Sequence, residues 1–400
     1  MDSARIEERI EAVLPEVAEL RHDLHAHPEL AYAEERTAGK VLAFLGGLEG
    51  LEVRTGMAGT GLVAVLGLDR KGPCVALRAD MDALPIEEES GVAWASRNPG
   101  RMHACGHDGH TAMLAGAAKV LHGLRERLEG PVKFIFQPAE EGGAGALRMC
   151  QEGVLADPPV AAIYGLHNNL PNPDLPLGSI VYGKGAAMAG TGTFTIEVIG
   201  VGGHAAFPHR SVDPVYIGAC IVDQLQGIVA RNVDPLSPAV VAVTRFHGGS
   251  SHNVIPGKAV LEGTFRALEA GLLEQLRDTI VGRAEGVAQA HGARVKIRCE
   301  LGYPVLENDP RAEEVFLEIV RELGWRDRLQ VAASILGGED FAYFGKEVPA
   351  FFYFLPSHTE GREHNVVCHH PCFDFNDGLL PLGMRLHVET ALRFARLWKA

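Results

Sequence analysis

Two short polar segments contain the residue types that bind metal ions and transfer protons. The segment HACGHDGH contains Cys105, His107 and His110. The segment QPAEEGGAGA places Glu140 beside Glu141 directly after an apolar run. Sulfur, imidazole nitrogen and carboxylate oxygen are the donor atoms that a borderline-soft divalent ion such as zinc accepts in proteins. A second carboxylate that does not bind the ion can take the proton of a water molecule that the ion activates. The two segments therefore predict metal-assisted hydrolysis.

The secondary structure expected around these segments is that of a parallel sheet. The first 185 residues alternate apolar runs with helical patterns; the runs 74–77, 132–136 and 160–166 are the expected strands, and 110–124 and 147–155 are two of the expected helices. Such alternation is typical of a largely parallel sheet that helices cover on both faces. The fold class is therefore expected to be α/β.

Polar residues follow each of these three strands at once. They are Arg78, Asp80 and Asp82 after the first strand, Gln137, Glu140 and Glu141 after the second, and His167 after the third. Open α/β sheets bind ligands outside the carboxyl ends of their strands. These residues, distant in sequence, are therefore expected to meet at one edge of the sheet.

A second domain is expected from about residue 190. There the order is strand, helix, two strands, helix and strand, at 193–199, 213–231, 240–246, 259–265, 269–290 and 294–299. This order is that of a ferredoxin-like α+β domain. An α/β pattern resumes at 310. Residues 188–303 are therefore expected to form a domain inserted into a catalytic domain of residues 1–187 and 304–400.

Composition narrows the class of protein. A chain of 400 residues exceeds what one hydrophobic core usually supports. The formal charge of −14 argues against nucleic acid and anionic membrane surfaces as partners, and no apolar segment has the length of a membrane span. The first 20 residues have helical apolar spacing, unlike a signal peptide. The 7 scattered cysteines fit free thiols in a reducing compartment, so a cytoplasmic location is expected.

Motifs along the whole chain resemble the M20 metallopeptidase family, and above all its amidohydrolase branch of hippurate hydrolases, N-acyl-amino-acid amidohydrolases and plant auxin-conjugate hydrolases. They are RADMDALP at 78–85, HACGHDGHT at 103–111, FQPAEEGGAGA at 136–146, GLH at 165–167, GGHAAFPH at 202–209, NVIPG at 253–257, GGEDF at 337–341 and HHP at 369–371. The resemblance implies a catalytic domain with two divalent metal ions (Zn, Mn, Co or Ni) and an inserted dimerisation or lid domain.

The same resemblance implies a role for particular residues. The implied metal ligands are Cys105, His107, Glu141, His167 and His369. Glu140 would be the general base, and Asp82 would orient the site from the strand end. Five side chains give two ions four ligands each only if the water and at least one side chain bridge them, so open positions are expected, as in catalytic sites.

Substrate recognition is assigned to the inserted domain by the resemblance. Asn253 and Arg266 resemble the pair that holds the α-carboxylate of the substrate, and the planar fork of Arg suits a carboxylate. His204 resembles a histidine that completes the active site of the neighbouring subunit. A homodimer or homotetramer is therefore expected.

Each of these residues also has a plainer interpretation. Cys105 is also readable as a buried free thiol, an interpretation that His107 and the strand-end carboxylates disfavour. The two glutamates are readable as a solvated pair, and His204 as a polar residue in a glycine turn. His110 is either a support for the ligands or a surface residue, and Asp80 and His370 are further possible ligands. The pair Cys368 and Cys372 lacks a second pair that would complete a metal site, so spectator thiols are expected there.

The function expected from the sequence is metal-dependent hydrolysis of the amide bond of N-acyl amino acids, of the N-benzoyl or N-acetyl type. The products are a carboxylic acid and an amino acid. A dipeptidase or aminopeptidase of the same family is the alternative enzyme. An inactive metal-bound protein that binds a small ligand is the alternative from another class, although such a protein has no need of Glu140 as a base.

Overall fold

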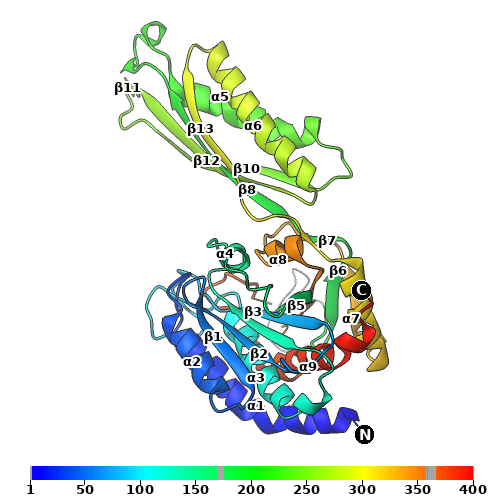
Figure 1. The fold of residues 1–400 in the computed structure, drawn as a ribbon. Helices are drawn as coiled ribbons and strands as arrows, with labels where there is room; N and C mark the ends of the chain where they lie inside the picture. The colour runs from blue at the N-terminus through cyan, green and yellow to red at the C-terminus, as the bar shows by residue number, and fades with distance from the viewer. Residues whose placement is uncertain (1, 169–174, 357, 359–365, 400) are drawn as a thin grey trace. The chain divides into compact units, whose positions relative to one another are not determined.

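The structure is a computed structural model that describes residues 2–168, 175–356, 358 and 366–399. Figure 1 shows the fold. The chain divides into two compact units. Unit 1 comprises Met1–Gly185, Glu307–Ala333 and Asp340–Ala400, and unit 2 comprises Ala186–Leu306 and Ser334–Glu339.

An eight-stranded sheet forms the centre of unit 1, with the strand order β1-β2-β4-β3-β5-β16-β6-β15. The strands are β1 (Leu51–Met57), β2 (Gly61–Leu66), β3 (Cys74–Asp80), β4 (Val132–Gln137), β5 (Val160–Asn168), β6 (Ile180–Gly183), β15 (Leu329–Ala332) and β16 (Ala350–Leu355). Strands β4, β3, β5 and β16 run parallel to one another, whereas β1, β2 and β4 pair antiparallel at one edge. The expected α/β fold with a mostly parallel sheet is confirmed.

Helices cover both faces of this sheet (Figure 1). They are α1 (Asp2–Ala26), α2 (Glu35–Leu45), α3 (His107–His122) and α9 (Leu380–Leu397) on one face, with α7 (Pro310–Glu322) beside α9, and α4 (Gly145–Gln151) and α8 (Ala342–Glu347) on the other. Every residue of β2, β3, β4 and β16 is buried. Continuous burial is what a covered parallel sheet requires, and it explains the uninterrupted apolar runs of these strands.

The register of the parallel strands brings the predicted site residues to one edge. Asp80 pairs with Gln137 across β3 and β4, and His167 pairs with Phe354 across β5 and β16. Strand β3 extends three residues beyond its expected end, so Arg78 and Asp80 lie inside the strand. Only Asp82 of that group follows the strand, and His167 likewise lies inside β5.

Unit 2 is built around a four-stranded antiparallel sheet of order β10-β12-β8-β13. Its strands are β8 (Gly190–Ile199), β10 (Ala239–Gly248), β12 (Lys258–Ala267) and β13 (Arg294–Leu301). Helices α5 (Pro214–Asn232) and α6 (Ala270–Ala290) pack against each other and against the sheet (Figure 1). The expected ferredoxin-like order is confirmed. The role of unit 2 in dimerisation or as a lid stays a prediction.

Short strands complete unit 2. Strands β9 (Gly203–His204) and β11 (Val254–Ile255) pair antiparallel, and β7 (Ala186–Met188) and β14 (Leu306–Glu307) lie where the chain passes between the units. None of the helices in the described part of the chain combines the length and hydropathy that a membrane crossing requires.

His387 is a buried polar residue of unit 1 that is not one of the predicted site residues. His387 of α9 is 1% exposed, and neither ring nitrogen has a hydrogen-bond partner among the described residues. Burial lowers the pKa of His387 from 6.5 to about 3. The folded protein therefore keeps this ring neutral at pH values where the unfolded chain protonates it.

The low pKa of His387 should make the protein less stable in acid. Below about pH 6.5 the unfolded state binds one more proton at this residue than the folded state. The free energy of unfolding therefore decreases as the pH is lowered, by up to about 1.4 kcal/mol per pH unit. His387→Leu removes that term. Between pH 7.5 and pH 5 the variant should lose about 2 kcal/mol less unfolding free energy than the wild type. Denaturant unfolding with a chelator present, so that release of metal ions does not contribute, measures this difference; equal losses in both proteins would refute it.

Candidate metal centre

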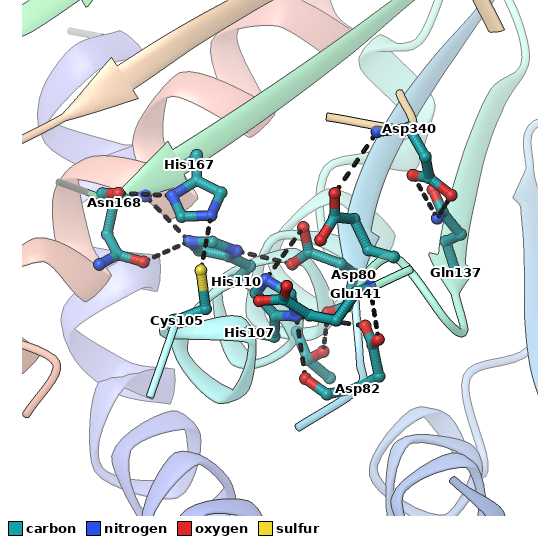
Figure 2. Close-up of polar contacts among 12 residues, drawn as sticks. Asp80, Asp82, Cys105, His107, His110, Gln137, Glu141, His167, Asn168 and Asp340 are labelled. Atoms are coloured by element: carbon teal, nitrogen blue, oxygen red, sulfur yellow. Dashed lines mark hydrogen bonds and ion pairs between the residues drawn. The ribbon is translucent and has the colours of Figure 1, made fainter. Parts of the chain in front are cut away.

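Three of the predicted ligands meet at the sheet edge of unit 1 (Figure 2). Cys105, His107 and Glu141 offer ligand atoms that lie within 4.8 Å of one another. Cys105 precedes α3, His107 is the first residue of α3, and Glu141 follows β4. His107 is fully buried, and its Nε2 atom has no hydrogen-bond partner among the residues that the structure describes. A buried imidazole nitrogen that makes no hydrogen bond, 3.7 Å from Oδ2 of Asp80 and beside a thiol and a carboxylate, fits a metal ligand.

Asp82 fixes the orientation of two of these ligands. His107 Nδ1 lies 2.9 Å from the carbonyl oxygen and 3.2 Å from Oδ1 of Asp82. Because a carbonyl oxygen only accepts, Nδ1 carries a proton, which leaves Nε2 as the ring atom that can give its lone pair to a metal ion once its own proton is lost. The other carboxylate oxygen, Asp82 Oδ2, accepts the backbone N–H of Glu141 at 2.8 Å. Partners of this kind set the tautomer and direction of metal-binding histidines.

The two remaining predicted ligands flank the cluster. His167 Nε2 lies 3.4 Å from Cys105 Sγ, and its Nδ1 donates to the carbonyl of Asn168. His369 Nε2 lies 3.1 Å from Glu141 Oε1, and its backbone has a φ of 70°. A positive φ is uncommon for a residue other than glycine and recurs at functional sites. His370 instead accepts the backbone N–H of Cys372 through Nδ1 at 3.0 Å. The structure thus turns His369, and not His370, toward Glu141.

The charges of the cluster favour a cation. Burial lowers the pKa of His107, but Asp80, Asp82 and Glu141 outweigh burial and raise it to about 10. Burial raises the pKa of Glu141, yet His369 and His107 outweigh it and bring the pKa below its ordinary value. The lowered pKa keeps the Glu141 carboxylate ionised, and its negative charge attracts a cation to the cluster. Sulfur, nitrogen and oxygen donors with this surplus of negative charge fit divalent metal ions.

Asp80 and His110 lie among these ligands (Figure 2), but both carboxylate oxygens of Asp80 and both ring nitrogens of His110 already make hydrogen bonds. Arg78 donates to Asp80 Oδ2 at 2.7 Å, and His110 Nδ1 lies 2.6 Å from Asp80 Oδ1. His110 Nε2 accepts the backbone N–H of Asn168 at 2.9 Å. Although Asp80 and His110 also form a group of metal-ligand spacing with His107 and His167, these hydrogen bonds make them supports.

Glu140 lies next to the cluster, and its side chain is directed differently from that of Glu141. It is 6% exposed, and Oε1 accepts the backbone N–H of Asp340 at 3.4 Å. The preceding residue, Ala139, has a φ of 56°. The fully buried Glu34 accepts the Ala139 N–H through Oε1 at 2.9 Å and the Thr60 hydroxyl through Oε2 at 2.6 Å. Glu34 therefore holds the turn that separates the directions of Glu140 and Glu141.

Glu34→Ala should reduce turnover. The change leaves the Ala139 N–H buried without an acceptor, at a cost of about 1–3 kcal/mol, and lets the strained turn relax. Displacing a catalytic group by about 1 Å can cost roughly 10²-fold in rate, so kcat should fall by about 10- to 100-fold. Glu34→Gln, which keeps one acceptor oxygen, should recover most of the rate. Glu29→Gln is the matched control, because Glu29 caps α2 through Arg36 and Thr37 and does not contact Ala139. Equal kcat values for Glu34→Ala and the wild type would refute the role.

Asp340 belongs to the GGEDF motif, but the sequence predicted no role for it. Its Oδ1 atom accepts from Gln137 at 2.7 Å and from Arg78 at 3.2 Å, and Oδ2 accepts the backbone N–H of Ala146 at 2.9 Å. Figure 2 shows Asp340 and Gln137 side by side at the sheet edge. Asp340 thereby ties the later part of the chain to the loop of Glu140. An acidic residue beside the apolar run FAYF was the signal in the sequence.

Asp108, which follows His107, was also missed. Its Oδ2 atom lies 2.9 Å from Arg21 Nε and 2.8 Å from His25 Nδ1, and all three side chains are fully buried. Burial lowers the pKa of His25, but Asp108 outweighs it and raises the pKa to about 9. The charged cluster anchors the first turn of α3 to α1.

The predicted residues of unit 2 lie at two ends of one sheet. His204 and Asn253 lie together, because β9 pairs with β11 and the Ala205 N–H donates to the Asn253 carbonyl at 3.1 Å. This pair lies next to the Lys258 end of β12, whereas Arg266 is at the opposite end. The eight residue steps from Lys258 to Arg266 in an extended strand span about 27 Å. The structure therefore does not bring Arg266 to His204 and Asn253 within one chain.

Known proteins resemble the chain over nearly its whole length. The model of Peptidase family M20/M25/M40 matches residues 76–393. N-acetylcysteine deacetylase of Bacillus subtilis is 39% identical over 93% of this chain and 95% of its own length. N-acyl-L-amino acid amidohydrolase of Geobacillus stearothermophilus is 42% identical over 81% of this chain and 87% of its own. The crystal structure of a Bacillus subtilis protein described as a dinuclear metal binding peptidase from the M20 family is 34% identical, with a TM-score of 0.81 and coverage of 96% and 99% of the two chains. The resemblance predicted from the motifs is confirmed: this chain belongs to peptidase family M20/M25/M40.

Proposed function

We propose that this protein is a metal-dependent amidohydrolase that cleaves N-acyl amino acids to a carboxylic acid and an amino acid. The observation that supports it best is the pairing of a buried Cys105–His107–Glu141 cluster with Glu140, a second carboxylate directed elsewhere. The names of relatives, a deacetylase of N-acetylcysteine and an amidohydrolase of N-acyl-L-amino acids, favour the same class of substrate.

The residues of the site have three proposed roles: binding metal ions, transferring a proton and positioning the ligands. Cys105, His107, Glu141, His167 and His369 would hold two divalent ions. When bound, the ions supply Lewis acidity, acidifying a water molecule and polarising the amide carbonyl. Glu140 takes the proton of the attacking water and passes it to the amide nitrogen as the amine leaves. Asp82 keeps His107 and Glu141 in place throughout.

We also propose that catalysis requires a dimer. Arg266 lies about 27 Å along β12 from Lys258, the end next to Asn253, and this is too far for both to contact one small substrate from a single chain. Arg266 of one protomer and the His204–Asn253 pair of a partner can meet the same substrate. Two-fold symmetry would then complete two equal sites.

A substrate panel tests the proposed activity. Amine release is measured from N-acetyl and N-benzoyl amino acids and from dipeptides, after Mn²⁺, Zn²⁺, Co²⁺ or Ni²⁺ is added to the apoprotein. The proposal expects the highest kcat/KM on an N-acyl amino acid. Preference for dipeptides with a free amine would favour a dipeptidase, and metal binding without any turnover would favour an inactive binding protein.

A further inference from the structure

A second thiol lies against the predicted ligand Cys105. Cys368 Sγ is 3.8 Å from the carbonyl oxygen of Cys105. A hydrogen bond between the two thiols, with burial, raises the pKa of Cys105 well above its ordinary value. The His369 N–H donates to the Ala104 carbonyl at 2.7 Å, which holds the two chain segments side by side at this point. Cys368 is therefore placed by backbone contacts and is not a spectator at the chain surface.

The other cysteines lack such a neighbour. Cys372, four residues on, is directed to the carbonyl of Glu89, with Sγ at 3.4 Å. Cys74 and Cys150 lie elsewhere in unit 1, while Cys220 and Cys299 belong to unit 2. None of the seven cysteines, all of which lie in the described ranges, forms a disulfide in this structure. The pair of Cys105 and Cys368 is thus the one placed for a local disulfide at the metal centre.

We propose that Cys105 and Cys368 form an oxidisable pair whose disulfide withdraws Cys105 from the metal centre. The oxidant is a peroxide. Cys368 is only half-buried, whereas Cys105 is buried, so the Cys368 thiolate attacks one peroxide oxygen, the O–O bond breaks, and hydroxide leaves a sulfenic acid on Cys368. The Cys105 sulfur then attacks the Cys368 sulfur, the S–O bond breaks, and water leaves as the S–S bond forms. The two sulfurs together lose two electrons, which reduce the peroxide.

When the disulfide forms, the metal centre should lose Cys105 as a ligand. A sulfur in a disulfide has no negative charge with which to bind a divalent ion, and thiolates bind metals only when deprotonated. Loss of the ion upon oxidation rests on the proposed ligand role of Cys105, whereas formation of the disulfide does not. A thiol reductant with added metal should reverse both changes.

The test exposes the metal-loaded, full-length protein to hydrogen peroxide. Intact mass should fall by two hydrogens, and a non-reducing peptide map should join the peptides of Cys105 and Cys368. A chromogenic chelator should report release of metal in parallel. In Cys368→Ser, metal release should be slower by about tenfold or more, because the thiol that the peroxide oxidises first is absent. Cys372→Ser is the matched control and should behave as the wild type.

Two results would overturn the proposal. One is a peptide map of the oxidised wild type that lacks the Cys105–Cys368 link, which needs no variant and holds even if Cys368→Ser folds poorly. The other is equal metal release from the wild type and Cys368→Ser. A linked pair without metal release would leave the oxidisable pair intact and count against Cys105 as a ligand. Amidohydrolase activity before oxidation is a separate readout, so failure of the proposed function is distinguishable from failure of this inference.

Discussion

Glu140→Gln should lower turnover by a factor of about 10² to 10⁴ and leave the metal content unchanged. The amide of glutamine is close in shape to the carboxylate but does not accept a proton from water. Glu140 is buried, and Oε1 accepts the Asp340 N–H, a contact that either oxygen-bearing side chain can keep. The variant should therefore fold and bind metal as the wild type does.

Glu141→Gln provides the contrast. Glu141 lies within the ligand cluster with Cys105 and His107, so loss of its charge should lower the metal content as well as the rate. Elemental analysis and steady-state kinetics on both variants separate the two roles. If Glu140→Gln lost metal while Glu141→Gln retained it, the assignment of base and ligand would be reversed.

Mixing two inactive proteins, His204→Ala and Glu140→Gln, should restore about a quarter of the wild-type activity. In a mixed dimer, one site combines an intact Glu140 with an intact His204 from the partner, and the other site contains both changes. Random exchange makes half of the dimers mixed, each with one good site of two, which gives this fraction under two-fold symmetry. The separation of Arg266 from the His204–Asn253 pair along β12 is the structural reason to expect it.

A matched mixture controls for exchange itself. Glu140→Gln mixed with Cys105→Ala places both changes in unit 1, at the site of each chain's own sheet edge, so each site of a mixed dimer has one defect and activity should not return. Exchange is verified by native mass spectrometry of differently tagged chains. Verified exchange without recovery in the first mixture would mean that His204 acts within its own chain or not at all.

The fold class could be predicted because its signals are local. The strands of unit 1 are continuous apolar runs, since helices cover both faces of the sheet, and the order of elements in unit 2 follows from periodicity alone. The end of β3 was misplaced for a physical reason. Arg78 and Asp80 look like loop residues, yet they lie inside the strand because each neutralises the other at 2.7 Å in a fully buried pair.

For parts of the site the sequence predicts which residues take part but not which atoms they contact. Asp82 and His107 were recognisable from their motifs, but the contact that fixes the His107 tautomer depends on how β3 meets α3. Glu34 was not recognised. It lies 105 residues before Ala139 in the sequence, and its function is to accept a backbone N–H, which leaves no pattern in the residues that surround it.

In unit 2, the sequence did not predict the distance between two site residues. Asn253 and Arg266 were expected to act as a pair because they resemble one in the family, but the extended strand β12 separates its ends by about 27 Å. A shared role read from motifs therefore does not establish how close two residues lie within one chain. Only the strand geometry of β12 suggests that the two residues serve different protomers.

Titration of the metal-free protein with Co²⁺, followed by amine release from the best N-acyl amino acid of the panel, tests the central claim most directly. The metal-free protein should be inactive, and activity should rise with added ion and saturate at about two ions per chain, because Cys105, His107, Glu141, His167 and His369 would together hold a pair of ions. Full activity in the metal-free protein, or saturation of the site with ions without hydrolysis of any N-acyl amino acid, would contradict the account.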